Sequence, residues 1–114
     1  MTAEALVPGA VVWVELDPAA GREQGGRRPA VIVAGRDYLE VVDTLAVIVP
    51  ITTVDRGWPN HVEIRGGELR RSCWAMTEQI RTVSRRRIVG QAGRVDGEVL
   101  RSIRQWVSDF LSDG

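Results

Sequence analysis

Residues 9–34 read GAVVWVELDPAAGREQGGRRPAVIVA and contain two apolar runs separated by a polar, glycine-rich segment. The runs at residues 11–16 and 30–33 are rich in β-branched and aromatic side chains, which favour β-strands. The segment between them is about a dozen residues long, and a loop of that length in a small domain usually has a function or is disordered. We therefore expect two strands joined by a loop with a possible role in function.

The rest of the chain continues the strand pattern and then changes to a helical one. Further strands are expected at residues 45–51, 61–64, 73–83 and 88–95, with a loop at 52–60 and a turn at Gly66-Gly67. Short strands at this spacing indicate a small barrel. After Asp96, a good N-cap residue, apolar side chains recur at helical spacing and predict one amphipathic C-terminal helix that packs on the barrel: Leu100, Ile103, Val107, Phe110 and Leu111.

Composition limits the class of protein. A chain of 114 residues with 44% hydrophobic content predicts one domain, residues 1–114. The net charge is zero, yet all 15 basic residues are arginine, which either genome composition or phosphate binding could explain. A single cysteine cannot form an internal disulfide, and no segment approaches the ~18 apolar residues of a membrane helix. We expect a reduced, soluble, cytoplasmic protein with no membrane partner.

The arginine pair at the end of the long loop is a candidate phosphate site. Gly25 and Gly26 allow a tight turn, and Pro29 restricts Arg28 to an extended conformation at the mouth of the following strand. A guanidinium held there suits a phosphate or the charge of a phosphorane. The alternative is that Arg27 and Arg28 form a solvated pair at a surface turn.

Polar residues on other segments bear on the same site. Thr52 follows the third apolar run as Arg28 precedes the second, so antiparallel neighbouring strands could bring both side chains to one end of the barrel. Glu78 and Gln79 lie in a strand that we expect to be largely buried, where unpaired polar groups are costly. They require protein partners or a ligand.

Four ordered segments resemble the MazF/PemK/Kid family of toxin endoribonucleases: residues 9–34, VIVPITT at 47–53, WPNHVEI at 58–64 and TEQIRTV at 77–83. The resemblance implies a mainly β fold, a compact SH3-like barrel with a C-terminal helix, working as a homodimer. It also implies cleavage of single-stranded RNA within short sequences, without a metal or other cofactor, and neutralisation by a cognate, MazE-like antitoxin.

The same resemblance assigns site residues. Arg28 and Thr52 occupy the two positions that the family uses for cleavage. Glu23 and Gln24 in the loop, and Glu78 with Gln79, match positions that line the RNA path. Two departures are Arg22, where the family commonly has serine, and Ala10, where it has an acidic residue.

Metal-free cleavage uses the 2′-hydroxyl of the RNA as nucleophile, and this assigns roles to three residues. Arg28 stabilises the phosphorane charge, because a side-chain pKa above ~12 conflicts with acid–base work. Thr52 can hydrogen-bond a phosphate oxygen or the 2′-hydroxyl, and Glu23 can orient Arg28 or accept a proton. The general base remains open.

Other reactive or aromatic side chains have simpler interpretations. His61 is expected to be structural or on the surface rather than a base, and Cys73 to be a small buried hydrophobe. Trp58 either stacks on an RNA base or covers a core or interface. Arg27 can contact RNA, whereas the Arg85–Arg87 run is first a solvated turn and only secondarily a source of RNA attraction.

A second class of toxin uses a similar barrel. A CcdB-like protein would bind and inhibit DNA gyrase through its C-terminal end, but the ending WVSDFLSDG lacks the Trp-Gly-Ile tail expected of it. The GGRRP and TEQIR segments favour the endoribonuclease. An inactive barrel that serves as a decoy for antitoxins is the third alternative.

Overall fold

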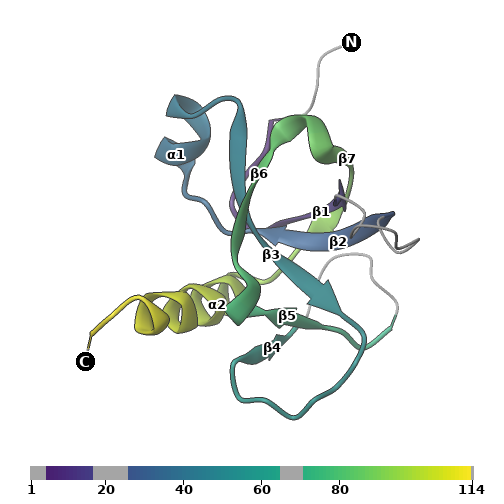
Figure 1. Cartoon of the computed structure of the whole chain (residues 1–114), viewed down its shortest axis with the longest axis vertical. Helices are drawn as coiled ribbons and strands as arrows, with labels where there is room; N and C mark the ends of the chain where they lie inside the picture. The colour runs from purple at the N-terminus through teal and green to yellow at the C-terminus, as the bar shows by residue number, and fades with distance from the viewer. Residues whose placement is uncertain (1–4, 17–25, 65–70, 114) are drawn as a thin grey trace.

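The computed structural model describes residues 5–16, 26–64 and 71–113, which form one curved antiparallel sheet with a long C-terminal helix across it (Figure 1). The elements in chain order are β1 (Ala10–Glu15), β2 (Arg27–Ile32), α1 (Arg36–Val41), β3 (Leu45–Thr52), β4 (His61–Glu63), β5 (Trp74–Met76), the 3₁₀ turn η1 (Thr77–Gln79), β6 (Arg81–Ser84), the 3₁₀ turn η2 (Arg85–Arg87), β7 (Ile88–Arg94) and α2 (Gly97–Phe110).

The sheet has the strand order β4-β5-β3-β2-β1-β7, and β6 pairs with the other half of β3. The prediction of a mainly β fold with a C-terminal helix is confirmed. A closed barrel is not formed by the described residues, because the two ends of this order, β4 and β7, do not pair. None of the helices in these residues is long and apolar enough to cross a membrane.

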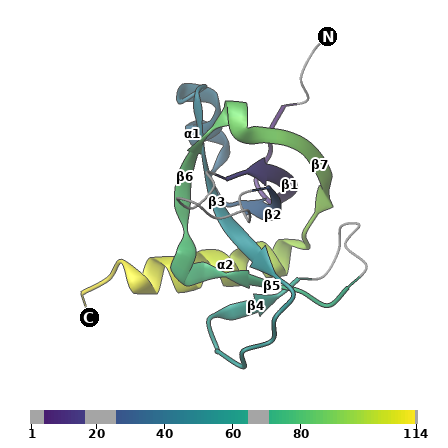
Figure 2. The same cartoon turned by 45° about the vertical axis from the view of Figure 1, so that its right-hand side comes forward.

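Both faces of the central strands are buried, which explains their continuous apolar sequence. In β1, Val11 belongs to the cluster beneath α2, whereas Val12 and Val14 belong to a second cluster on the opposite face. Strand alternation sends successive side chains to opposite faces, so one run of valines fills two cores. Figure 2 shows α2 lying across the first of these faces.

The packing of α2 corrects the predicted helical stripe. Ile103 and Val99 are fully buried in the core, and the predicted stripe omitted Val99. At the other end, Phe110 and Leu111 are 50% and 79% exposed, so the last turn does not pack on the sheet. The exposed Arg104 donates to the backbone oxygens of two residues that follow β2, Val33 and Ala34.

Residues 73–83 do not form one strand, contrary to the prediction. They form β5, η1 and β6, and both strands pair with β3. The register shifts between the two pairings, and η1 takes up the extra residues. Pro50 lies beside this irregularity, where a residue without a backbone N–H is tolerated.

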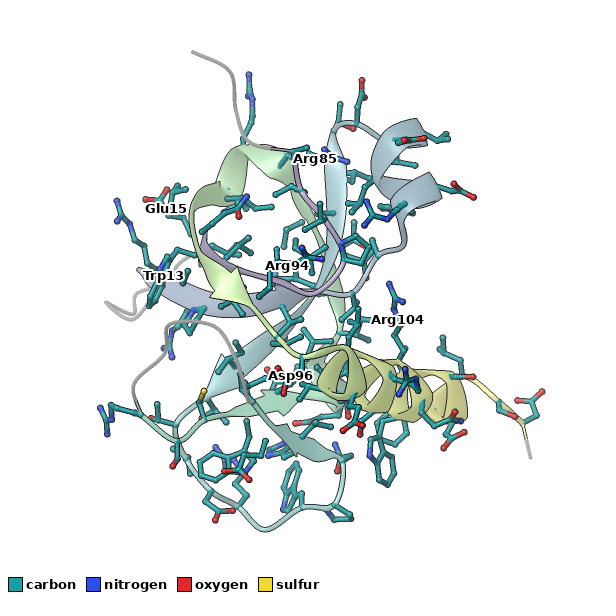
Figure 3. All side chains as sticks on the ribbon, turned by 180° about the vertical axis from the view of Figure 1, so that it is seen from behind. Trp13, Glu15, Arg85, Arg94, Asp96 and Arg104 are labelled. Carbon is teal, nitrogen blue, oxygen red and sulfur yellow. The ribbon has the colours of Figure 1, made fainter. Side chains whose placement is uncertain are left out.

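The segment 35–42 contains a short helix that the sequence interpretation missed. Leu39 of α1 is buried in the second cluster, and Arg85 of η2 donates to the backbone oxygens of Leu39, Val42 and Leu45. Figure 3 shows Arg85 between η2 and α1. Arg85 is therefore a structural residue, not part of a solvated turn, and Arg87 similarly donates to the Glu15 backbone oxygen.

Candidate active site

A cleft of about 380 Å³ opens beside the ends of β2, β3 and β5. Arg28 and Thr52 both line it, so the strand order brings together the two residues that the sequence placed on separate segments. The pairing of Ala30 with Pro50, extended outward along both strands, sets Arg28 opposite Thr52. The remaining lining residues are Trp13, Pro29, Ile51, Thr53, Val54, Arg71 and Cys73.

Arg28 is held by strand pairing rather than by a loop. β2 begins earlier than predicted, at Arg27, and Arg28 pairs with Val14 of β1. Its side chain is exposed, and within the described residues no salt bridge to it is formed. Arg27, the preceding residue of the same strand, does not line the cleft. A fixed backbone therefore carries the guanidinium of Arg28 at the cleft, and no described residue forms a salt bridge with it.

Thr52 is the last residue of β3 and is half-buried. Its Oγ1 accepts a hydrogen bond from the Val54 backbone N–H at 3.1 Å. This bond fixes the hydroxyl oxygen and leaves its proton available to donate. Thr52 can thus donate to a phosphate oxygen from the wall next to Arg28.

Glu78 is not in the cleft, and it is not buried in a strand as predicted. Both Glu78 and Gln79 lie in η1 and are exposed. The Glu78 carboxylate receives a hydrogen bond from Asn60 Nδ2 at 2.7 Å, and both of its oxygens lie 3.1 Å from His61 Nε2. Its principal polar contacts are thus with the protein, and they tie η1 to the start of β4.

These contacts also set the ionisation of Glu78. Partial burial by itself would raise the pKa of Glu78, but hydrogen bonds from His61, its own backbone and Asn60, with the charge of His61, lower the pKa below its usual value. An ionised carboxylate only accepts hydrogen bonds, so His61 Nε2 carries the proton. The carboxylate is therefore the stable form of Glu78 at neutral pH.

We expect Glu78→Gln to lower the free energy of unfolding by about 0.5–1.5 kcal/mol at neutral pH, because charged hydrogen bonds become neutral ones. A lowered folded pKa stabilises the protein above the unfolded pKa, and this contribution is lost as pH falls through the folded pKa. Urea unfolding at a series of pH values should show the two proteins converging in acid. A difference that stays constant into acid would contradict this role of the carboxylate.

His61 and Trp58 form a tilted ring contact outside the cleft. His61 is buried, and the Trp58 ring lies against it with centroids 4.8 Å apart. Trp58 itself is 47% exposed, with the Arg56 guanidinium 5.8 Å from its ring centroid. His61 is therefore structural, and Trp58 covers it while keeping part of its surface free.

Cys73 lies at the wall of the cleft but is nearly fully buried. Burial, with a smaller effect from the charge of Glu63, raises the pKa of its thiol. It is a packing residue, as predicted, since a protonated thiol is a poor nucleophile. Glu23 and Gln24 lie outside the described residues.

Arg71 is a cleft residue that the sequence interpretation missed. It lies shortly before β5, in a stretch without a strand or helix pattern, and its position depends on β5 pairing with β3. The single sequence signal was its charge, which it shares with every other arginine of the chain.

Comparison with solved structures places this fold in one class. A MazE–MazF crystal structure (Form-II) from Deinococcus radiodurans superimposes with a TM-score of 0.82 and 26% identity, covering 98% of this chain and 100% of that one. The class is thus the MazF-type fold, an antiparallel sheet crossed by a C-terminal helix.

The sequence comparisons define the family. Residues 8–111 match the family described as PemK-like, MazF-like toxin of type II toxin-antitoxin system, and this chain belongs to that family. The endoribonuclease toxin MazF of Escherichia coli (strain K12) is 34% identical over 104 residues, which cover 90% of this chain and 91% of that protein. Endoribonuclease EndoA of Bacillus subtilis (strain 168) is 31% identical over 99 residues, which cover 83% and 84%. The prediction of an endoribonuclease of this family is confirmed.

Proposed function

We propose that this protein cleaves single-stranded RNA in the cleft by attack of the substrate's own 2′-hydroxyl, without a metal ion. The observation that carries the proposal is the shared cleft of Arg28 and Thr52, two side chains on adjacent strands whose chemistry suits a phosphate. In support, the described residues contain no group of three or more His, Cys, Asp or Glu side chains that could hold a metal ion. Sequencing the RNA ends produced from a mixed RNA pool tests the proposal.

The cleft residues would stabilise the reaction rather than transfer protons. The 2′-oxygen forms a bond to phosphorus, the bond from phosphorus to the 5′-oxygen breaks, and the leaving oxygen takes a proton. Arg28 would neutralise charge on the non-bridging oxygens with its forked donors, and Thr52 would donate one further hydrogen bond. Among the described lining residues none is a carboxylate or histidine, so Glu23 remains our candidate for orienting Arg28 or accepting the proton.

The RNA would continue beyond the cleft over residues predicted from the sequence. Trp58 has enough exposed surface to stack on a base, and its contact with Arg56 supports an aromatic and cationic platform. Gln24, Arg27, Glu78 and Gln79 complete the proposed RNA contacts. With such a substrate, we propose a cytoplasmic location for the protein.

We also propose a two-fold homodimer formed through the C-terminal half of α2. Phe110 and Leu111 are exposed there. Leu111, Val107 and Ile80 border two adjoining hollows of about 610 and 290 Å³, and Phe110 borders the smaller one. An apolar face of this kind on a small domain favours burial against an identical face. Val107 and Ile80 are only partly buried in the single chain, which leaves them available to the contact.

Sedimentation equilibrium at micromolar concentration should therefore give the mass of a dimer. The Leu111→Asp substitution should raise the dissociation constant of this dimer at least tenfold. Asp109→Asn, on an exposed position of the same helix, is the matched control. A monomer in the unaltered protein would contradict the proposal.

The remaining partner is an antitoxin of the MazE kind. An acidic segment that folds as it binds could lie across the arginine-lined cleft and exclude RNA. A neutralising protein that binds fully while RNA cleavage continues would rule out this steric account.

A further inference from the structure

We propose that Arg71 is a second phosphate-binding residue of the cleft, which holds the phosphate next to the one that is cut. The inference rests on the proposed function, since it concerns the path of the same RNA. Arg71 lines the cleft together with Arg28 and Thr52, and nothing in its sequence context indicated this position.

The strand order sets the two arginines on opposite sides of Thr52. β3 lies between β2 and β5, with Arg28 on the β2 side, and Thr52 pairs with Trp74 of β5 on the other. Arg71 approaches from this second side. Neighbouring strands are about 4.8 Å apart, so two strand spacings of about 10 Å separate β2 from β5, and Arg71 lies three residues before β5 begins.

This separation favours contact of the cleft with two successive phosphates of the RNA over contact with a single phosphate. The forked donors of Arg28 and the hydroxyl of Thr52 already match the non-bridging oxygens of a single phosphate. A second guanidinium that comes from the β5 side of the cleft is better placed for the next phosphate along the chain. The apolar lining between them, which includes Ile51 and Val54, leaves no competing anion in the described wall.

Charge supports the same assignment. Arg71 is exposed, and within residues 5–16, 26–64 and 71–113 it forms no salt bridge. No carboxylate is among the described residues that line the cleft, so none of these residues compensates its two guanidinium charges. Such a surface attracts a polyanion, and each phosphate contact releases counterions on binding.

The first test compares Arg71→Ala with the unaltered protein on an RNA oligonucleotide that contains a mapped cut site. We expect kcat/KM to fall about tenfold, mainly through KM, because the lost contact is to a phosphate that does not react. The slope of log Kd against log salt, measured on an uncleavable oligonucleotide with 2′-deoxyribose at the cut, should decrease by about 0.7. Arg71→Lys should regain most of the affinity, since a point charge can bind one phosphate.

Arg86→Ala is the matched control, because Arg86 is an exposed arginine of η2 that does not line the cleft. The decisive measurement replaces single phosphates of the RNA with neutral methylphosphonates on either side of the cut. In the unaltered protein, one neighbouring replacement should weaken binding about tenfold, and in Arg71→Ala the same replacement should have no further effect.

Two results would overturn the inference. One is a kcat/KM for Arg71→Ala within twofold of the unaltered protein, and the other is undiminished sensitivity of Arg71→Ala to every neighbouring methylphosphonate. If Arg28→Ala is inactive in the same assays, either of these two results rejects only the phosphate-binding role of Arg71. Normal cleavage by Arg28→Ala would instead reject the proposed site, whatever Arg71 does.

Discussion

Replacing Arg28 with alanine is expected to lower kcat about 100- to 1000-fold, the usual loss when one preorganised stabiliser of transition-state charge is removed. Arg28 lies in the cleft beside Thr52, and its charge is uncompensated by the described residues. The same exposure means that the free energy of unfolding should change by less than about 0.5 kcal/mol. Single-turnover cleavage and thermal unfolding of the same preparation measure both effects.

Two variants sharpen this prediction. Arg28→Lys should recover little of the rate, because an ammonium cannot make the forked contact with two phosphate oxygens. Arg86→Ala, with the same loss of charge on an exposed turn, should cleave normally. Turnover of Arg28→Ala close to that of the unaltered protein would remove Arg28 from the site.

The second large effect concerns the substrate. An RNA with 2′-deoxyribose only at the cut nucleotide should bind but remain intact, because it lacks the nucleophile. Cleavage of ordinary RNA should survive excess chelator and give a 2′,3′-cyclic phosphate, or its opened form, and a 5′-hydroxyl. Gel analysis with end-specific enzymes distinguishes these products from 5′-phosphate ends.

The control for this experiment is the same RNA with 2′-deoxyribose one nucleotide away, which should be cut at nearly the normal rate. A metal-dependent hydrolase would lose activity with chelator and could cut the deoxy position. A gyrase-directed toxin would cut no RNA and would stop DNA supercoiling. Efficient cutting at the deoxy position would refute the 2′-hydroxyl mechanism even though the family assignment stands.

Local pattern was sufficient for most elements of the fold. Strands β1 and β3 have continuous apolar runs, because both of their faces are buried, whereas α2 has an apolar stripe on one side. These two patterns differ in periodicity and are therefore strong signals. The prediction of one strand over residues 73–83 was wrong, because a local pattern does not report how a strand pairs. Its break at η1 is required by the two pairings with β3, and no single-strand pattern carries that information.

The candidate site also combines residues that the sequence identified with contacts that depend on the fold. Arg28 and Thr52 could be chosen from the sequence, since each stands next to a recognisable strand and matches a family motif. Their juxtaposition is a result of antiparallel pairing between β2 and β3. The contacts of Glu78 with His61 and Asn60 could not be foreseen, because they join η1 to the start of β4 across a long separation in the chain.

By itself, the sequence determined most of the strands, the C-terminal helix, the family and the two residues proposed for cleavage. Only the tertiary structure decided that Arg71 shares their cleft, that Arg85 secures α1 and that Phe110 and Leu111 are exposed. The physical reason is that periodicity reports which side of an element is buried, whereas these three facts depend on which other element lies against that side.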